Sequence, residues 1–344
     1  MPKTLIETIS DKEHLRSAWD QIKKNPTSKG IDNVTISDFA ADLTDQLDKI
    51  RELLNKQLYR FELLRPSPIP KKSGGIRPLR IPIIRDRVVQ KSIAMAIENT
   101  LDQHHHLDNG VSFAYIKKKS VFDAVKQILA HHNTGLQWIY KTDIVSFFER
   151  IDITKLLDEK VFPILRDNTI NFYIQDALKS EVANKEWLQK NNWINDYTST
   201  GLPQGGILSP LFANVYLADF DQKVIAANMK MIRYADDLMI LCESQETAEQ
   251  ANTLCENLVH DLGLEIHERA DDGDAEKKGT FIQKFDDGFN FLGIRFDHDK
   301  TYPASTAYAK QSEKILEARS NKKNLIEAIF YLKSQKRARF IVEL

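Results

Sequence analysis

The sequence predicts an α+β fold in which a small antiparallel sheet is backed by helices. Three observations carry this prediction. Residues 137–144 alternate between apolar and polar side chains, as a half-buried strand does. Residues 229–242 form two apolar runs around a polar centre, which is the pattern of a strand–turn–strand unit. Helical periodicity dominates the segments before and after this core.

The segment before the core is mainly helical and contains one hairpin. Residues 37–58 carry an apolar stripe at helical spacing, and residues 88–101 predict a second long helix. Prolines between these two helices force extended backbone. The turn residues at 73–75 therefore predict a hairpin that pairs residues 68–71 with residues 76–79.

The core itself alternates strands, helices and one loop that is rich in glycine. Glu149 lies three residues after Ser146, which is the spacing of a capping box, so a helix is expected to begin at Ser146. Residues 201–209 predict the glycine-bearing loop. Residues 289–296 predict a further strand, and residues 305–343 predict helices.

Composition excludes several classes of protein. The 344 residues are 42% hydrophobic and 28% charged, which is typical of an ordinary globular chain with room for two or three domains. No apolar stretch is long enough to cross a bilayer, and residues 1–15 lack a signal-peptide core, so a cytoplasmic protein with no membrane partner is expected. Neither Cys242 nor Cys255 belongs to a C-x-x-C pair, which argues against a zinc module or a disulfide framework.

The net charge of −1 hides an uneven distribution. Basic residues crowd the segments 56–91, 117–119 and 310–339, whereas acidic residues gather at 265–287. Basic segments beside an acidic centre favour a groove for a polyanion next to a metal site. The alternative is that these charges lie on solvated helix faces.

Three carboxylates are the candidates for that metal site. Asp236 and Asp237 are adjacent at the predicted turn, and Asp143 ends another apolar strand. Adjacent carboxylates repel each other, and a divalent metal with oxygen ligands would offset the repulsion. On its own, an Asp-Asp pair in a turn is ordinarily just a turn.

Further motifs accompany the carboxylates in a fixed order. They are Gly30-Ile31-Asp32; Ile69-Pro70-Lys71 with Gly75-Ile76-Arg77-Pro78-Leu79; Asp86-Arg87-Val88-Val89-Gln90; Asp143-Ile144-Val145-Ser146-Phe147-Phe148; Gly201-Leu202-Pro203-Gln204-Gly205-Gly206; Arg233-Tyr234-Ala235-Asp236-Asp237; and Phe291-Leu292-Gly293. Over residues 29–297 this ordered set resembles the reverse transcriptases, most closely those of group II introns and of bacterial defence systems.

The resemblance implies a right-hand polymerase. Its palm would be an antiparallel, RRM-like sheet, its fingers helical and its thumb short and helical. The implied boundaries are fingers at 1–104 and 156–203, palm at 105–155 and 204–297, and thumb at 298–344.

The resemblance also implies a metal site. Asp143, Asp236 and Asp237 would be catalytic and, with the backbone oxygen of Ile144, would hold two Mg²⁺ ions. One ion would activate the primer 3′-hydroxyl, and the other would neutralise the triphosphate and the leaving pyrophosphate.

Other residues would contact the substrates. Lys71, Arg77, Phe148 and Gln204 would bind the dNTP, and Phe291, Leu292 and Gly293 would form the primer grip. Phe148 would stack under the sugar and exclude a 2′-hydroxyl, which implies selection of dNTPs over rNTPs. The alternative at each position is structural, namely a solvent-facing charge, a turn residue or a core aromatic.

These implications describe an RNA-directed DNA polymerase that adds dNTPs to a primer 3′-hydroxyl. Its partners would be an RNA template, such as a dedicated non-coding RNA, and the DNA product. The residues after Gly293 leave room for a thumb but not for a maturase or endonuclease domain, so anti-phage defence is expected rather than intron mobility. Two alternatives stay open, namely untemplated or protein-primed synthesis of repetitive DNA and an RNA-binding scaffold that keeps the fold.

Two expectations concern the end of the chain. Lys277 and Lys278 are candidates for the general acid that protonates pyrophosphate, with a solvent-exposed loop as the alternative. The apolar residues 340–344 predict a contact with a partner subunit or with a second copy of the chain.

Overall fold

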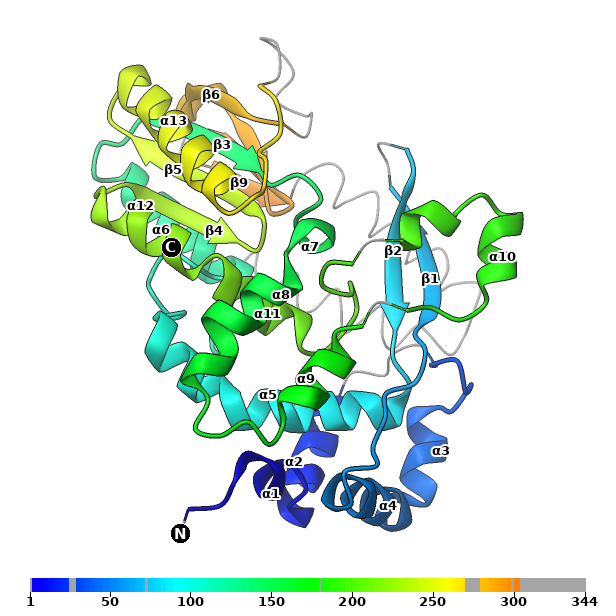
Figure 1. Ribbon diagram of the computed structural model, residues 1–344. Helices are drawn as coiled ribbons and strands as arrows, with labels where there is room; N and C mark the ends of the chain where they lie inside the picture. Colours follow the sequence, from blue (N-terminus) through cyan, green and yellow to red (C-terminus); the bar gives the residue numbers. More distant parts are fainter. Residues whose placement is uncertain are drawn as a thin grey trace. The chain divides into compact units, whose positions relative to one another are not determined.

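The computed structural model describes residues 2–24, 29–71, 74–179, 181–198, 200–269, 279–297 and 300–303 (Figure 1). The chain divides into two compact units, residues 1–108 with 146–219 and residues 109–145 with 220–344. These are the first and the second unit.

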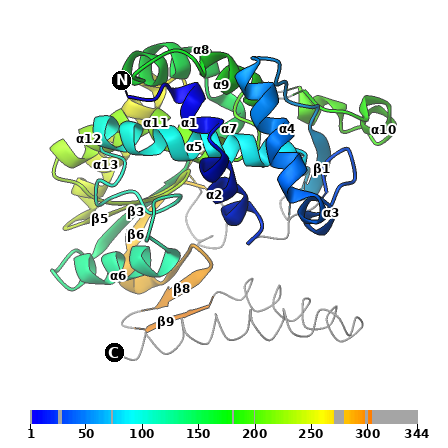
Figure 2. The ribbon, with the colours of Figure 1, turned by 90° about the horizontal axis from the view of Figure 1, so that it is seen from below.

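The first unit is built around the long helix α5, Ile84–His105, which buries eleven residues, four of them polar or charged. The helices α1 (Leu5–Ile9), α2 (Lys12–Ile22) and α4 (Leu43–Asn55) pack against it (Figures 1 and 2). The short helix α3, Ile36–Ala41, precedes α4. The predicted single helix over 37–58 is therefore two helices, because the backbone at Asp42 leaves the helical region.

The predicted hairpin is present in the first unit. Strands β1 (Arg65–Pro70) and β2 (Ile76–Ile81) pair antiparallel, with Ile69 opposite Arg77. The remaining segments described in this unit are short: α7 Phe147–Arg150, α8 Ile153–Lys155, η1 Leu156–Val161, η2 Phe162–Ile164, α9 Asn171–Ala177, α10 Lys185–Lys190, η3 Ile194–Tyr197 and α11 Ser209–Tyr216. Helix α12, Ala218–Ala226, begins with two residues of this unit, and its other residues belong to the second unit.

The second unit contains a four-stranded antiparallel sheet in the order β4-β5-β3-β6. The strands are β3 Trp138–Asp143, β4 Lys230–Tyr234, β5 Asp237–Cys242 and β6 Phe281–Lys284. Helix α13, Gln245–Asp261, contacts β3, β5 and β6, and helix α6, Val121–His132, contacts β4 and β5 (Figure 1). Successive side chains of a strand point to opposite faces, so each face of the sheet has its own apolar layer.

A second, three-stranded sheet completes this unit. Its strands are β7 (Phe289–Phe291), β8 (Ile294–Asp297) and β9 (Lys300–Pro303), and η4 (Phe285–Asp287) precedes them. The predicted single strand over 289–296 is wrong, because Leu292 and Gly293 both have positive φ and turn the chain back. Two central residues with positive φ are the requirement of a tight hairpin turn.

The α+β class with an antiparallel sheet is confirmed. The expected helices at 305–343, the two candidate lysines at 277 and 278, the apolar end at 340–344 and most of the expected thumb lie outside the described residues. Among the helices that the structure describes, none combines the length and the apolar character needed to span a membrane.

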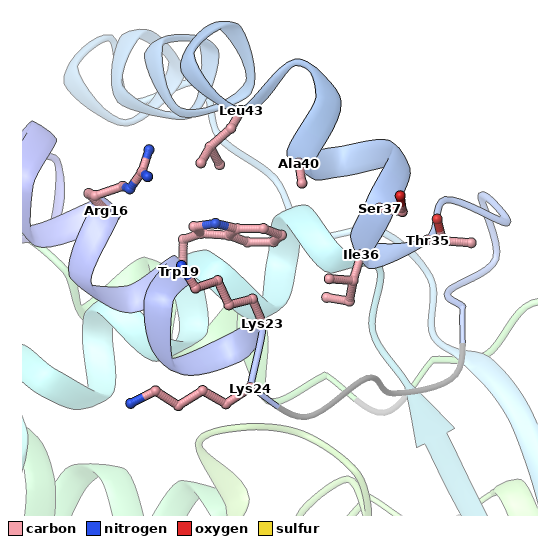
Figure 3. Close-up of a pocket in the computed structure, with 9 residues that line it drawn as sticks. All are labelled: Arg16, Trp19, Lys23, Lys24, Thr35, Ile36, Ser37, Ala40 and Leu43. Atoms are coloured by element: carbon pink, nitrogen blue, oxygen red, sulfur yellow. The ribbon is translucent and has the colours of Figure 1, made fainter. Parts of the chain in front are cut away.

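A groove of about 890 Å³ lies between α2 and the helices α3 and α4 (Figure 3). Its floor includes Trp19, which is buried and stacks on Phe39 with ring centroids 5.1 Å apart. Three cations line it from the side of α2, namely Arg16, Lys23 and Lys24. The groove is therefore apolar at its base and basic along one wall.

Candidate functional site

Two of the predicted carboxylates face each other across the central strands of the sheet. Asp143 ends β3, Asp237 begins β5, and the two are direct partners in the antiparallel register. Directly opposite residues place their Cβ atoms about 5 Å apart on the same face. Asp143 is 8% exposed, and the side chain of Asp237 is 39% exposed. The register of the two apolar strands therefore places a close pair of carboxylates at one end of the sheet.

Asp236 lies in the turn that joins β4 to β5. The turn has two central residues, Ala235 and Asp236, because Tyr234 pairs with Asp237. Ala235 has a φ of 60°, a conformation that costs a residue with a side chain about 1–2 kcal/mol. The carbonyl oxygen of Asp236 accepts a hydrogen bond from the Ile144 amide at 3.3 Å. The backbone of the turn is therefore tied to the residue that follows Asp143.

A buried ion pair stabilises the backbone of this turn. Arg233 donates through Nε and Nη2 to the two carboxylate oxygens of Asp221, at 2.7 and 2.5 Å, and both side chains are 1% exposed. Arg233 also donates through Nη1 to the carbonyl oxygen of Ala235 at 3.2 Å. A planar guanidinium that bonds two groups in one plane fixes their relative position. Asp221 was not predicted, and no sequence spacing signals such a pair across twelve residues.

The carboxylate pair meets one chemical requirement of a cation site. Oδ1 of Asp143 is buried, and no donor among the described residues bonds to it. A buried carboxylate oxygen without a donor is costly unless a positive charge satisfies it. Lys141 places its Nζ 3.6 Å from Oδ1 of Asp237. Within the described part of the chain, no three His, Cys, Asp or Glu side chains converge as a complete metal-binding group.

Gln204 lies in the first unit, in a loop that packs closely against the backbone at Arg80 and at Phe148. Its Nε2 donates to Oε1 of Glu149 at 2.9 Å. A Cβ on Gly205, whose φ is 111°, would lie 2.7 Å from the Arg80 carbonyl oxygen, and a Cβ on Gly201 would collide with the backbone of Phe148. Glycine is therefore required at both positions for this loop to reach its place.

Phe148 lies in α7 and differs in burial from its neighbour Phe147. Phe147 is 2% exposed and belongs to the core, whereas Phe148 is half-buried. The predicted capping box at Ser146 is wrong, because Ser146 has a φ of 48° and its side chain caps no amide. Glu149 instead binds Gln204, which lies too far along the chain for the sequence to indicate.

Lys71 and Arg77 lie on the β1–β2 hairpin of the first unit. Both side chains are exposed. Arg77 is on β2, opposite Ile69, and the Lys71 amide donates to the carbonyl oxygen of Gly75 at 3.0 Å. The hairpin thus presents two cations to solvent near its tip.

The expected primer grip is the tight hairpin turn between β7 and β8 in the second unit. Phe291 pairs with Ile294, and the turn between them consists of Leu292 and Gly293. Phe291 is 2% exposed and joins the apolar cluster under the sheet. Lys141 Nζ lies 5.9 Å from the centre of its ring. Lys141 therefore lies near both Phe291, at the start of this turn, and Asp237.

The block at 86–90 makes hydrogen bonds within the first unit. Asp86 accepts from the Tyr59 hydroxyl at 2.7 Å and from the Glu62 amide at 2.8 Å, and burial raises its pKa to about 6. The side-chain oxygen of Gln90 accepts from the Ile207 amide at 2.9 Å. Gln90 thereby anchors the loop that carries Gln204. Asp86 ties α5 to the segment that precedes β1.

Comparisons with known proteins give the family of the chain. Residues 69–296 match the family described as reverse transcriptase (RNA-dependent DNA polymerase). The group II intron-encoded protein LtrA of Lactococcus lactis subsp. cremoris is 31% identical over 214 residues, which is 61% of this chain and 33% of LtrA. Protein YkfC of Escherichia coli K12 is 29% identical over 203 residues, which is 58% of this chain and 50% of YkfC.

More distant relatives complete the comparison. The retron Ec73 reverse transcriptase of Escherichia coli is 27% identical over 50% of this chain and 51% of its own. Among solved structures, a partial Cas6-RT-Cas1–Cas2 complex has a TM-score of 0.43 at 24% identity, covering 76% of this chain and 42% of that one. The chain spans half or less of the first curated relatives that it matches. On the match over residues 69–296, the chain belongs to the reverse transcriptase family.

Proposed function

We propose that the protein is an RNA-directed DNA polymerase that adds dNTPs to a primer 3′-hydroxyl. The observation that carries the proposal is the carboxylate pair of Asp143 and Asp237, opposed across two apolar strands, with Asp236 in the adjoining turn. Membership of the reverse transcriptase family supports the same reaction. The four-stranded sheet would serve as the palm, and the first unit would contribute the fingers.

The metal site is part of this proposal. Asp143, Asp236, Asp237 and the backbone oxygen of Ile144 would hold two Mg²⁺ ions, which would activate the primer hydroxyl and stabilise the charge on the triphosphate. Oδ1 of Asp143 is buried and accepts no hydrogen bond from the described residues, which supports a cation at this place. The protein itself fixes the carboxylates, through the register of β3 with β5 and through the Arg233 contact to the turn.

The nucleotide contacts belong to the same proposal. Lys71 and Arg77 would bind the triphosphate, which their exposure on a hairpin supports. Gln204 would position the incoming nucleotide, and Phe148 would exclude a 2′-hydroxyl. Phe291, Leu292 and Gly293 would form the primer grip, which a tight turn over the apolar cluster supports.

Primer extension tests the proposed activity. The protein, a primed RNA template, dNTPs and Mg²⁺ should give extended DNA, and Asp236→Asn should lower the rate by more than about a hundredfold, because a metal ligand is lost. The matched control is Asp261→Asn, which makes the same change at an exposed residue at the end of α13. Extension at the normal rate by Asp236→Asn would rule out this site as the catalytic one, and would favour a scaffold role if the RNA is still bound.

The proposed RNA partner would be contacted in part by the basic groove beside α2. Lys24, on its rim, would contact an RNA phosphate (Figure 3). Lys24→Ala should then weaken binding equally for different RNA sequences and reduce the salt slope of log affinity by about one unit. The exposed Lys126→Ala on α6 serves as control. Equal RNA affinity and equal salt slope for wild type and Lys24→Ala would exclude the groove as a contact.

The biological role in anti-phage defence belongs to the same proposal. It is motivated by the resemblance to bacterial defence enzymes and by the retron reverse transcriptase among the relatives. A host that carries the wild-type gene should resist a phage to which the Asp236→Asn host is sensitive. Equal plaque counts on the two hosts across a broad phage panel would contradict the role.

A further inference from the structure

Lys141 is a buried lysine beside the carboxylate pair. It lies on β3 two residues before Asp143, so both side chains project from the same face of the sheet. Lys141 is only 8% exposed. Its Nζ lies 3.6 Å from Oδ1 of Asp237, which is itself the strand partner of Asp143. One cation and two carboxylates are thus gathered at the same end of the sheet.

The surroundings of Lys141 fix the position of its ammonium group. β3 has neighbours on both sides, and Lys141 pairs with Met239 on β5 and with Phe281 on β6. The ammonium lies 5.9 Å from the ring centres of Phe281 and Phe291. A buried ammonium is costly unless an anion pairs with it, and aromatic faces add a weaker attraction. The contact with Asp237 therefore restrains both side chains.

The carboxylate pair needs such a charge. Like charges that lie directly opposite across two strands destabilise the pairing. Lys141 approaches Asp237, whereas Oδ1 of Asp143 receives no donor from the described residues. The ammonium group of Lys141 therefore partly neutralises Asp237. Oδ1 of Asp143 stays available to a further cation. An incoming divalent cation would have to share Asp237 with Lys141.

We propose that Lys141 is a positioning residue that acts as the resident counter-ion of Asp237 and thereby weakens and tunes the binding of divalent metal. The inference rests on the proposed function, because it takes this carboxylate pair as the metal site. Lys141 holds Asp237 in place before the metal arrives, and its charge opposes the metal charge when both share that carboxylate. Removal of the lysine should therefore tighten metal binding.

Mn²⁺ binding to the full chain tests the inference, in the absence of nucleic acid and dNTP. Lys141→Met should lower the dissociation constant about tenfold, because a unit charge within a few ångströms of the metal is removed. Lys141→Arg, which keeps the charge, should bind Mn²⁺ like the wild type. Lys126→Met is the matched control, since Lys126 also lies over an aromatic ring, 4.6 Å from that of Phe122, but on the exposed face of α6.

A second variant covers the case in which Lys141→Met does not fold, as judged by circular dichroism. Lys141→Gln keeps a polar tip and should show the same tightening. Unchanged or weaker Mn²⁺ binding by the folded neutral variant would overturn the inference. Asp143→Asn separates the two proposals: if it abolishes Mn²⁺ binding while Lys141→Met changes nothing, only the role of Lys141 fails. If Asp143→Asn leaves Mn²⁺ binding intact, the metal site of the proposed function fails.

Discussion

At the scale of single residues, we predict different effects for substitutions of the two adjacent phenylalanines after β3. Phe148 is half-buried and is the proposed sugar gate, so Phe148→Ala should raise the incorporation of rNTPs relative to dNTPs. Phe147 is 2% exposed, so Phe147→Ala should lower the free energy of unfolding by about 3–5 kcal/mol instead. Competition assays with mixed dNTPs and rNTPs and chemical denaturation measure the two effects. An unchanged sugar preference in Phe148→Ala would exclude the gate.

Single residues also show where sequence reasoning succeeds. The apolar strand pattern indicated that Asp143 would meet Asp237 if their strands were neighbours, and β3 does pair with β5. Glu149 and Lys141 were missed. Their roles depend on Gln204 and Asp237, which lie 55 and 96 positions further along the chain, and no local pattern reports such contacts.

At the scale of elements, the ion pair between α12 and β4 makes a stability prediction. Asp221→Asn leaves Arg233 buried without its carboxylate and should lower the free energy of unfolding by about 3–5 kcal/mol. Asp219→Asn is the control from the same helix. Asp219 pairs with Lys160 at 2.6 Å, but its side chain is 64% exposed, so the loss should stay below about 1 kcal/mol. Equal losses in the two variants, measured by urea denaturation, would contradict this account.

The hydrogen bonds between Asp86 on α5 and the segment that precedes β1 lead to a prediction about pH. Burial raises the pKa of Asp86 to about 6, so the folded protein retains a proton that the unfolded chain releases near pH 4. The free energy of unfolding should therefore fall between about pH 4 and pH 6, by up to about 3 kcal/mol from this group. Asp86→Asn cannot titrate and should lack that part of the fall. Identical pH profiles for the variant and the wild type would show that Asp86 ionises normally.

The elements also show why some sequence expectations failed. The hairpin of β1 with β2 and the strands β3, β4 and β5 were predicted because turn residues and apolar runs are local signals. The capping box at Ser146 failed because a left-handed backbone at that residue removes its side chain from the helix end. The prediction of one strand over 289–296 failed because Leu292 adopts positive φ, a conformation that the residue type leucine does not indicate.

At the scale of the whole molecule, the residues predicted to take part in the reaction are divided between the two units. The second unit holds the carboxylates, Lys141 and the primer-grip turn, and the first holds the Gln204 loop and the β1–β2 hairpin. The division into fingers, palm and thumb stays a prediction. The order of motifs along the chain was sufficient to predict the family, which the match over residues 69–296 confirms. The long-range contacts within each unit are visible only in the structure.

The most direct test of the central claim is the addition of a single nucleotide on a defined RNA template. With the next template base set to uracil, the protein should add one dAMP from dATP and should discriminate against the other dNTPs, and Asp236→Asn should add none. Changing that base to cytosine should move the preference to dGTP. Addition of nucleotides regardless of the template base, or undiminished addition by Asp236→Asn, would contradict RNA-directed synthesis at this site.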